Sequence, residues 1–273
     1  MSLSAALPLV LVGAGKMGGA MLAGWLDCGL DPKGVTVVDP SPPPEMAALV
    51  ETAGIARAAS AEGLAAPAVL VVAVKPQMMA AVLPALAPVV GPDTVVVSVA
   101  AGTRLSTLRA ALGDAPAIVR AMPNTPAQVG RGMTVGCAGP EVTDAQRDIV
   151  TRLLEAVGDV AWIADENDMD AVTAVSGSGP AYVFLLAECL AAAGEAAGLS
   201  PELATQLARA TVSGAGELLA RSQESSETLR RNVTSPGGTT AAALAVLMAE
   251  AGVPDLMKAA VAAAAARSRE LAS

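Results

Sequence analysis

The sequence contains no histidine, only 1% aromatic residues and three cysteines among 273 residues. Histidine is the commonest metal-binding side chain and the commonest proton donor near neutral pH, so its absence excludes Ser/His/Asp catalysis and argues against a metal site. The cysteines, Cys28, Cys137 and Cys189, are odd in number and far apart. This pattern is typical of reduced thiols in a cytoplasmic protein.

Positive charge is also scarce, because 17 Lys and Arg stand against 26 Asp and Glu, a formal net charge of −9. Nucleic acids and anionic membranes bind basic stripes, and the sequence shows none, so we expect neither as a partner. The longest charge-free stretches, such as residues 77–92, are interrupted by proline or glycine. We therefore expect no transmembrane helix.

What the chain has in abundance is small apolar residues, with 53% of the sequence hydrophobic. Its length exceeds what one core usually organises, which predicts two domains. From Leu7 to about Trp162, short β-branched runs alternate with longer Ala/Leu-rich stretches. This is the pattern of repeated βαβ units, so we expect a mostly parallel Rossmann-type sheet with helices on both faces. The expected strands are 9–12, 35–38, 69–74, 94–99, 117–121 and 134–137.

After about Ala164 the β-branched runs stop and long helical stretches follow. We therefore predict an α/β protein with a dinucleotide-binding domain at residues 1–164 and an all-helical domain at 165–273. Ala and Gly permit close helix packing, which favours an intertwined dimer, and a monomeric bundle is the alternative. The expected helices are 180–197, 201–222, 240–251 and 254–271.

A glycine motif, Gly13-Ala14-Gly15-Lys16-Met17-Gly18, follows the first predicted strand and opens a predicted helix. In that context Gly13 permits the tight turn, Gly15 lets a pyrophosphate approach the backbone, and Gly18 lets the helix pack on its strand. The helix N-terminus offers amides and positive potential to phosphates. The motif predicts a dinucleotide site, and a glycine-rich turn without a ligand is the alternative.

Asp39 ends the second predicted strand, where a carboxylate can accept hydrogen bonds from the adenosine ribose and would repel a 2′-phosphate. This position favours NADH over NADPH, unless Asp39 is only a loop cap or faces solvent.

Loops after later strands should surround the nicotinamide, because ligands of parallel sheets lie beyond the carboxyl ends of the strands. Lys75 follows an apolar strand directly, which favours a cleft position over a surface charge. The cofactor-binding candidates in these loops are Ala73, Val74, Lys75, Pro76, Ala100, Ala101 and Asn124.

Two segments in the second half join hydroxyl-bearing residues to helix starts, Ser176–Ala181 and Ser235–Thr240. Free amides at Gly237, Gly238 and Thr239 would bind a small carboxylate, with the helix dipole adding to the attraction. Ordinary helix caps are the alternative for both segments.

The chain resembles the pyrroline-5-carboxylate reductase family over nearly its whole length. Besides the glycine motif, the matching segments are Ala73–Pro76, Arg120–Pro126, Ala171–Thr173 with Ser176–Tyr182, and Asn232–Thr240. The last two are specific to that family.

This resemblance implies reduction of 1-pyrroline-5-carboxylate to L-proline by NADPH or NADH. It also implies a homodimer with interleaved helical domains and the substrate site at their interface, or further assembly into a ring, a decamer of dimers. By position Gly237, Gly238 and Thr239 look like the carboxylate cradle and Thr240 like the hydroxyl that contacts the ring nitrogen. The other implied residues are Glu166, Thr173, Ser176 and Ser178 around substrate and nicotinamide, and Asn232 and Val233 at the cofactor.

The imine nitrogen needs a proton, and without histidine the donor must be a hydroxyl such as that of Thr240 or a positioned water. The chain departs from the family at two places. Asp39 stands where many members have Ser or Thr, and the stretch 225–231 lacks the His-Pro-Gly and Lys-Asp usual before Asn232.

Rival functions remain. A β-hydroxyacid dehydrogenase needs a lysine in the second domain, where Lys258 is the only one. Another imine reductase, or a nucleotide-binding protein without turnover, would share the architecture.

Overall fold

The computed structural model describes residues 3–113 and 116–271, and the chain divides into two compact units. The sheet unit comprises Met1–Gly177 with Ala265–Ser273, and the helical unit comprises Ser178–Ala264. This division falls later than the expected boundary at residues 164 and 165. The reason is that Glu166 is bonded to Arg120 and Ser176 to Asn124, both inside the sheet unit.

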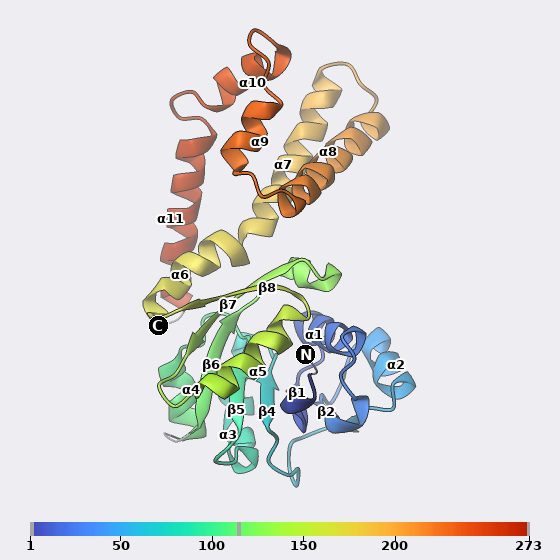
Figure 1. Ribbon diagram of the computed structural model, residues 1–273, viewed down its shortest axis with the longest axis vertical. Coiled ribbons are helices and arrows are strands. Elements are labelled where there is room, and N and C mark those ends of the chain that lie inside the picture. The colour runs from blue at the N-terminus through green and yellow to red at the C-terminus, as the bar shows by residue number, and fades with distance from the viewer. Residues whose placement is uncertain (1–2, 114–115, 272–273) are drawn as a thin grey trace. The chain divides into compact units, whose positions relative to one another are not determined.

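The sheet unit is built on eight strands in the order β3-β2-β1-β4-β5-β6-β7-β8 (Figure 1). Neighbouring strands are parallel except β6 and β7, which pair antiparallel with Arg120 opposite Cys137. The apolar runs β1, β4 and β5 are buried along their whole length, as central parallel strands are. The strands are β1 (Leu9–Val12), β2 (Val35–Val38), β3 (Ala56–Ala58), β4 (Val69–Val72), β5 (Val95–Ser98), β6 (Ala117–Met122), β7 (Gly132–Ala138) and β8 (Gly158–Ile163).

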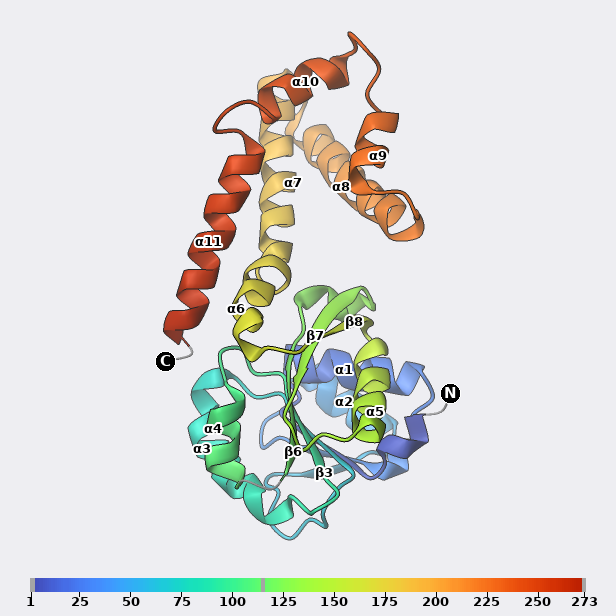
Figure 2. The ribbon, with the colours of Figure 1, turned by 60° about the vertical axis from the view of Figure 1, so that its left-hand side comes forward.

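Helices cover both faces of this sheet (Figure 2). One core contains Met21, Leu22 and Trp25 of α1, which form the apolar face of this helix. The buried Trp25 Nε1 donates to the Leu153 carbonyl of α5 at 2.7 Å, which ties the two helices together. The helices of this face are α1 (Lys16–Asp27), α2 (Pro44–Thr52) and α5 (Asp144–Glu155), and those of the second core are α3 (Met79–Leu86) and α4 (Leu105–Leu112).

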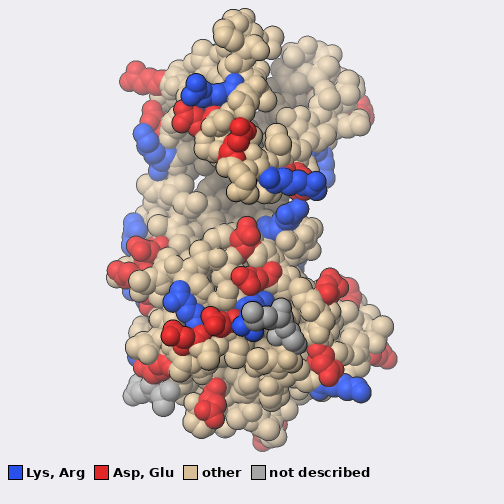
Figure 3. All heavy atoms as spheres, viewed as in Figure 1, with Lys and Arg blue, Asp and Glu red and all other residues tan. Residues whose placement is uncertain are grey.

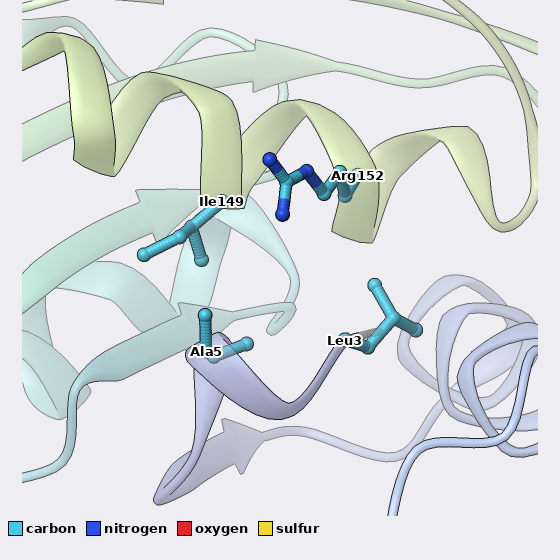
Figure 4. Close-up of a pocket in the computed structure, with 5 residues that line it drawn as sticks. Leu3, Ala5, Ile149 and Arg152 are labelled. Carbon is cyan, nitrogen blue, oxygen red and sulfur yellow. The ribbon is translucent and has the colours of Figure 1, made fainter. Parts of the chain in front are cut away.

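The N-terminal turn η1 (Leu3–Ala6) packs against α5, where Leu3 and Ala5 face Ile149 and Arg152 across a shallow pocket (Figure 4). Because η1 precedes β1, this pocket lies at the amino end of the strand. The glycine motif follows the opposite end of β1, so the pocket lies away from the predicted nucleotide site.

The helical unit starts with a hairpin of two long helices, and the expected helices are confirmed within a few residues. Small residues set its packing, since a Cβ at Gly194 would lie 3.2 Å from the Ala204 Cβ. Ser200 caps the second helix by accepting the Leu203 amide. A short helix, α9, was not expected. The helices are α7 (Gly179–Ala196), α8 (Pro201–Arg221), α9 (Ser226–Asn232), α10 (Thr239–Leu247) and α11 (Val253–Leu271), whose last residues belong to the sheet unit.

Apolar side chains remain exposed along these helices, among them Phe184 at 61% and Leu186 at 58%. On the face drawn in Figure 3, uncharged residues cover most of the helical unit and charges occur in small groups. By length and composition alone, the stretch Glu166–Ala196 passes as a candidate membrane span. A helix that packs against a protein partner has the same composition.

Candidate active site

The glycine motif forms the loop between β1 and α1. Gly13 has φ +90°, and a Cβ there would lie 2.8 Å from the Ala73 carbonyl oxygen. A Cβ at Gly18 would overlap the Gly13 carbonyl, so glycine is needed where the helix crosses its strand. At Gly15, by contrast, an added Cβ meets no described atom within 4 Å. These three environments fit the turn, the helix packing and the open approach that a pyrophosphate requires.

This loop lies where the sheet order reverses, because β1 pairs with β2 on one side and with β4 on the other. Ligands of open parallel sheets bind at that point. Gly15 is the N-cap of α1 and offers no side chain to the first turn. The amides of Lys16, Met17 and Gly18 have no acceptor within the helix, since the first amides of any helix lack one. The loop therefore fits a dinucleotide with its phosphates at the helix start.

Asp39 directly follows β2 and is bonded to the glycine loop. Its Oδ2 accepts the Ala14 amide at 2.7 Å and its Oδ1 accepts the Ser41 amide at 2.9 Å. Asp39 thus caps this loop, and capping alone does not exclude contact with the ribose. Each carboxylate oxygen has a second lone pair, so these bonds leave capacity for a ribose hydroxyl.

The other expected cofactor loops also follow carboxyl ends of strands. The Ala73 amide donates to the Val12 carbonyl at 2.8 Å, which continues the pairing of β1 and β4 into their loops. Val74 is half-buried, whereas Lys75 and Pro76 are exposed at the start of the turn η3 (Pro76–Met78). After β5, Ala100 is buried and Ala101 is exposed.

Glu166 lies in the sheet unit and carries two bonds. Its Oε1 accepts the Arg120 Nη1 at 2.7 Å and the Leu105 amide of α4 at 2.9 Å. Arg120 is buried, so this ion pair is shielded on its arginine side. The pair of Arg120 and Glu166 anchors the segment that follows Glu166 to the sheet. Glu166 also affects the nearby Cys137: burial raises the pKa of the Cys137 thiol, and the Glu166 carboxylate raises it further.

That segment contains the turn η7 (Thr173–Gly177), which is π-helical. The Thr173 hydroxyl donates to the Met169 carbonyl at 2.8 Å. The Ser176 carbonyl and Oγ accept the Asn124 Nδ2 at 3.2 and 3.3 Å. Single π-helical turns occur often at functional sites. This link between Asn124 and Ser176 was not predicted.

The remaining predicted residues lie in the helical unit. Ser178 is the N-cap of α7, and Gly237 has φ +70° just before α10. The Gly238 amide donates to the Ser235 carbonyl at 3.0 Å, so the expectation of three free amides is wrong for Gly238. Thr239 and Thr240 form the first turn of α10, where amides lack helical acceptors.

Two residues placed at the cofactor by resemblance lie at the end of α9. The Asn232 Nδ2 donates to the Glu224 Oε2 at 3.1 Å. Val233, the next residue, is 64% exposed. An apolar side chain so exposed has contact surface available for a ligand or a partner chain.

Comparison with known proteins matches each half of the chain to a different family model and nearly the whole chain to pyrroline-5-carboxylate reductases. A family model described as pyrroline-5-carboxylate reductase dimerisation matches residues 166–271, and one described as NADP oxidoreductase, coenzyme F420-dependent, matches residues 8–102. The pyrroline-5-carboxylate reductase of Pseudomonas aeruginosa is 41% identical over 264 residues, covering 97% of this chain and 96% of that protein.

Solved structures agree. A pyrroline-5-carboxylate reductase from Coxiella burnetii superposes with a TM-score of 0.91 at 34% identity, covering 98% of this chain and 99% of that one. The Plasmodium falciparum pyrroline carboxylate reductase with NADP bound gives 0.83 at 31% identity, covering 99% and 100%.

Proposed function

We infer the function from one premise, that the chain belongs to the pyrroline-5-carboxylate reductase family. The enzyme is an oxidoreductase that reduces the cyclic imine 1-pyrroline-5-carboxylate to L-proline, the last step of proline biosynthesis, with NADPH or NADH. The observation that carries this conclusion is 41% identity over 97% of the chain. These relatives do not favour the alternative functions, a β-hydroxyacid dehydrogenase, another imine reductase or a nucleotide-binding protein without turnover.

The nucleotide is held, in this proposal, by the loop Gly13–Gly18 and the loops that follow β4 and β5. The open space at Gly15 and the first-turn amides of α1, which have no acceptor within the helix, support this assignment. When bound, the reduced nicotinamide supplies the hydride that the imine carbon accepts. Asp39 disfavours a 2′-phosphate by its charge, so we propose that the enzyme uses NADH better than NADPH.

The substrate carboxylate is bound by Gly237, Gly238 and Thr239 in this proposal. Two features support it: the left-handed Gly237 and the first turn of α10, whose amides point out of the helix start. The Gly238 amide is shared with the Ser235 carbonyl, so Gly237 and Thr239 contribute more.

The proton for the ring nitrogen comes from the hydroxyl of Thr240, directly or through a water, and Ser176 and Ser178 supply further hydroxyls. The imine C=N gains a hydride at carbon and a proton at nitrogen, and Thr240 recovers its proton from solvent, so that the reduction balances. Glu166 and Thr173 line the substrate pocket, while Asn232 and Val233 contact the nucleotide. Holding a flat ring in one orientation lowers the barrier further by reducing the entropy lost on reaction.

We propose that the enzyme works as a homodimer, assembled through the helical unit, in the cytoplasm. The exposed apolar residues of α7 support a protein partner on this surface, since monomers rarely expose so much. The family model that matches residues 166–271 is named for dimerisation. The net charge of −9 weighs against nucleic acid and anionic membranes as partners.

The deciding experiment follows oxidation of NADH and of NADPH separately by the purified protein with 1-pyrroline-5-carboxylate. We expect proline to form in equal amount to the nucleotide consumed. Binding of nucleotide without any oxidation would instead identify a binding protein, and reduction of β-ketoacids would identify a dehydrogenase of that class.

A further inference from the structure

Both polar atoms of the Asn124 side chain are bonded to protein groups in the sheet unit. Its Oδ1 accepts the Met133 amide of β7 at 2.8 Å, and its Nδ2 donates to Ser176. The Met133 N–H can only donate, so the oxygen of the amide must face it and the NH2 must face Ser176. The orientation of Asn124 is therefore fixed by the backbone of β7.

This orientation sets the direction of the hydrogen bond at Ser176. Because Asn124 donates, the Ser176 Oγ acts as acceptor at 3.3 Å, and its own proton points elsewhere. The Ser176 carbonyl accepts from the same amide at 3.2 Å, which holds the backbone of the π-helical turn as well. Asn124 thus presents Ser176 as a hydrogen-bond donor.

The strand before Asn124 holds the same segment at other points. Arg120 and Met122 lie on β6, and Asn124 continues in extended conformation with φ −128° and ψ 168°. Alternate residues of an extended chain face the same side. Arg120 bonds Glu166. Met122 packs closely on Gly177, where an added Cβ would lie 2.5 Å from the Met122 Cε. One face of this strand therefore contacts both ends of Glu166–Gly177.

We propose that Asn124 is a positioning residue that fixes the hydroxyl of Ser176, and that it does not act by contacting the nucleotide. The proposal rests on the proposed function, in which the Ser176 hydroxyl takes part in reduction. Asn124 acts through Ser176, so its loss slows turnover and leaves nucleotide affinity unchanged.

The test variant is Asn124→Asp. Its carboxylate still accepts the Met133 amide, but its second oxygen accepts where the amide donated, so it repels the Ser176 carbonyl and attracts the hydroxyl proton. The matched control is Gln146→Glu. Gln146 also accepts a backbone amide, from Thr143 at 3.0 Å, and donates to a backbone carbonyl, of Asp93 at 3.3 Å.

We expect kcat of Asn124→Asp to fall by about 10-fold to 100-fold, the loss typical of a small misplacement of a reacting group. The Kd for NADH and the kcat of Gln146→Glu should stay at the wild-type values. In the double variant with Ser176→Ala, kcat should equal that of Ser176→Ala alone, because Asn124→Asp acts through the hydroxyl that Ser176→Ala removes. Hydrogen exchange should accelerate over 173–177 in Asn124→Asp only.

Three results would overturn the proposal while leaving the reductase function intact. Weakened NADH binding with unchanged kcat would make Asn124 a nucleotide contact. A double variant slower by the product of the single losses would show that the two residues act independently. A fully active Ser176→Ala would remove Ser176 from the proposed chemistry and the proposal with it. If the wild type shows no reductase activity, the proposed function fails, and hydrogen exchange still tests whether Asn124 anchors the turn.

Discussion

Substituting Asp39 by Asn tests how the enzyme distinguishes NADH from NADPH. Two unit charges about 4 Å apart interact by about 1 kcal/mol in water and about 4 kcal/mol at the effective dielectric constant of about 20 near a protein surface. Asp39 is half-buried and bonded at both oxygens, so an intermediate repulsion applies. A value of about 2 kcal/mol corresponds to about 30-fold in kcat/KM. Asn is neutral and keeps one oxygen for a loop amide.

The assay measures kcat/KM for both nucleotides at saturating imine. We expect Asp39→Asn to raise the NADPH to NADH ratio by about 30-fold. The control is Asp31→Asn, because Asp31 also caps a backbone amide, that of Lys33 at 2.9 Å, but precedes β2. An unchanged ratio in Asp39→Asn would refute the argument, since the carboxylate would then not face the 2′ position. If the NADPH to NADH ratio of kcat/KM changed equally in both variants, the cause would be the lower net negative charge of the protein and not the position of Asp39.

Three further predictions concern the loop, the proton donor and the core. Gly15→Ala should leave the unfolding temperature, measured by calorimetry, unchanged but weaken NADH binding, measured by titration. Gly18→Ala should lower the unfolding temperature. If the two variants had the same unfolding temperature and the same Kd for NADH, the assigned roles would be contradicted. Thr240→Ala should lower kcat by about 10² to 10³ and Thr240→Ser should restore most of it, while a loss below about threefold would exclude Thr240 as donor. Ser268→Ala should lower the free energy of unfolding by about 1 to 3 kcal/mol, because it removes the 2.6 Å bond to the buried Asp170. Denaturant titration measures this free energy, and a value equal to that of the wild type would contradict the prediction.

The sequence predicts the sheet unit well where strands are apolar and buried. The run Leu9–Val12 and the run Val69–Val72 are recognisable because both faces of a central parallel strand need apolar residues. β3 and β8 were missed for the same reason. β3 has three residues with Arg57 exposed, and β8 starts with Gly158 and Asp159, so neither contains a continuous apolar run.

Helix starts were predicted because their signals are local. Thr143 and Gln146 form a capping box at the start of α5, and Ser200 caps α8. α9 is bounded by Ser225, which caps it, but its seven residues contain too little apolar periodicity to be recognised. The glycine motif was interpretable because each of its glycines answers a local backbone requirement.

Contacts between distant residues are what the sequence could not reveal. Arg120 pairs with Glu166, and Asn124 with Ser176. The motif around Asn124 and the segment around Ser176 were both recognised from the sequence, but a contact between them was not predicted. Nothing in residue type or spacing joins an amide to a serine in another segment. The hydrogen bond between Asn124 and Ser176 depends on the antiparallel pairing of β6 and β7. This pairing brings the Met133 amide to the Asn124 oxygen and leaves the NH2 group for Ser176. A reaction without histidine needs its hydroxyls held in one orientation, because a free hydroxyl rotates. β7 is paired on both sides, with β6 and with β8, so its backbone holds Asn124 through Met133, and Asn124 in turn holds Ser176.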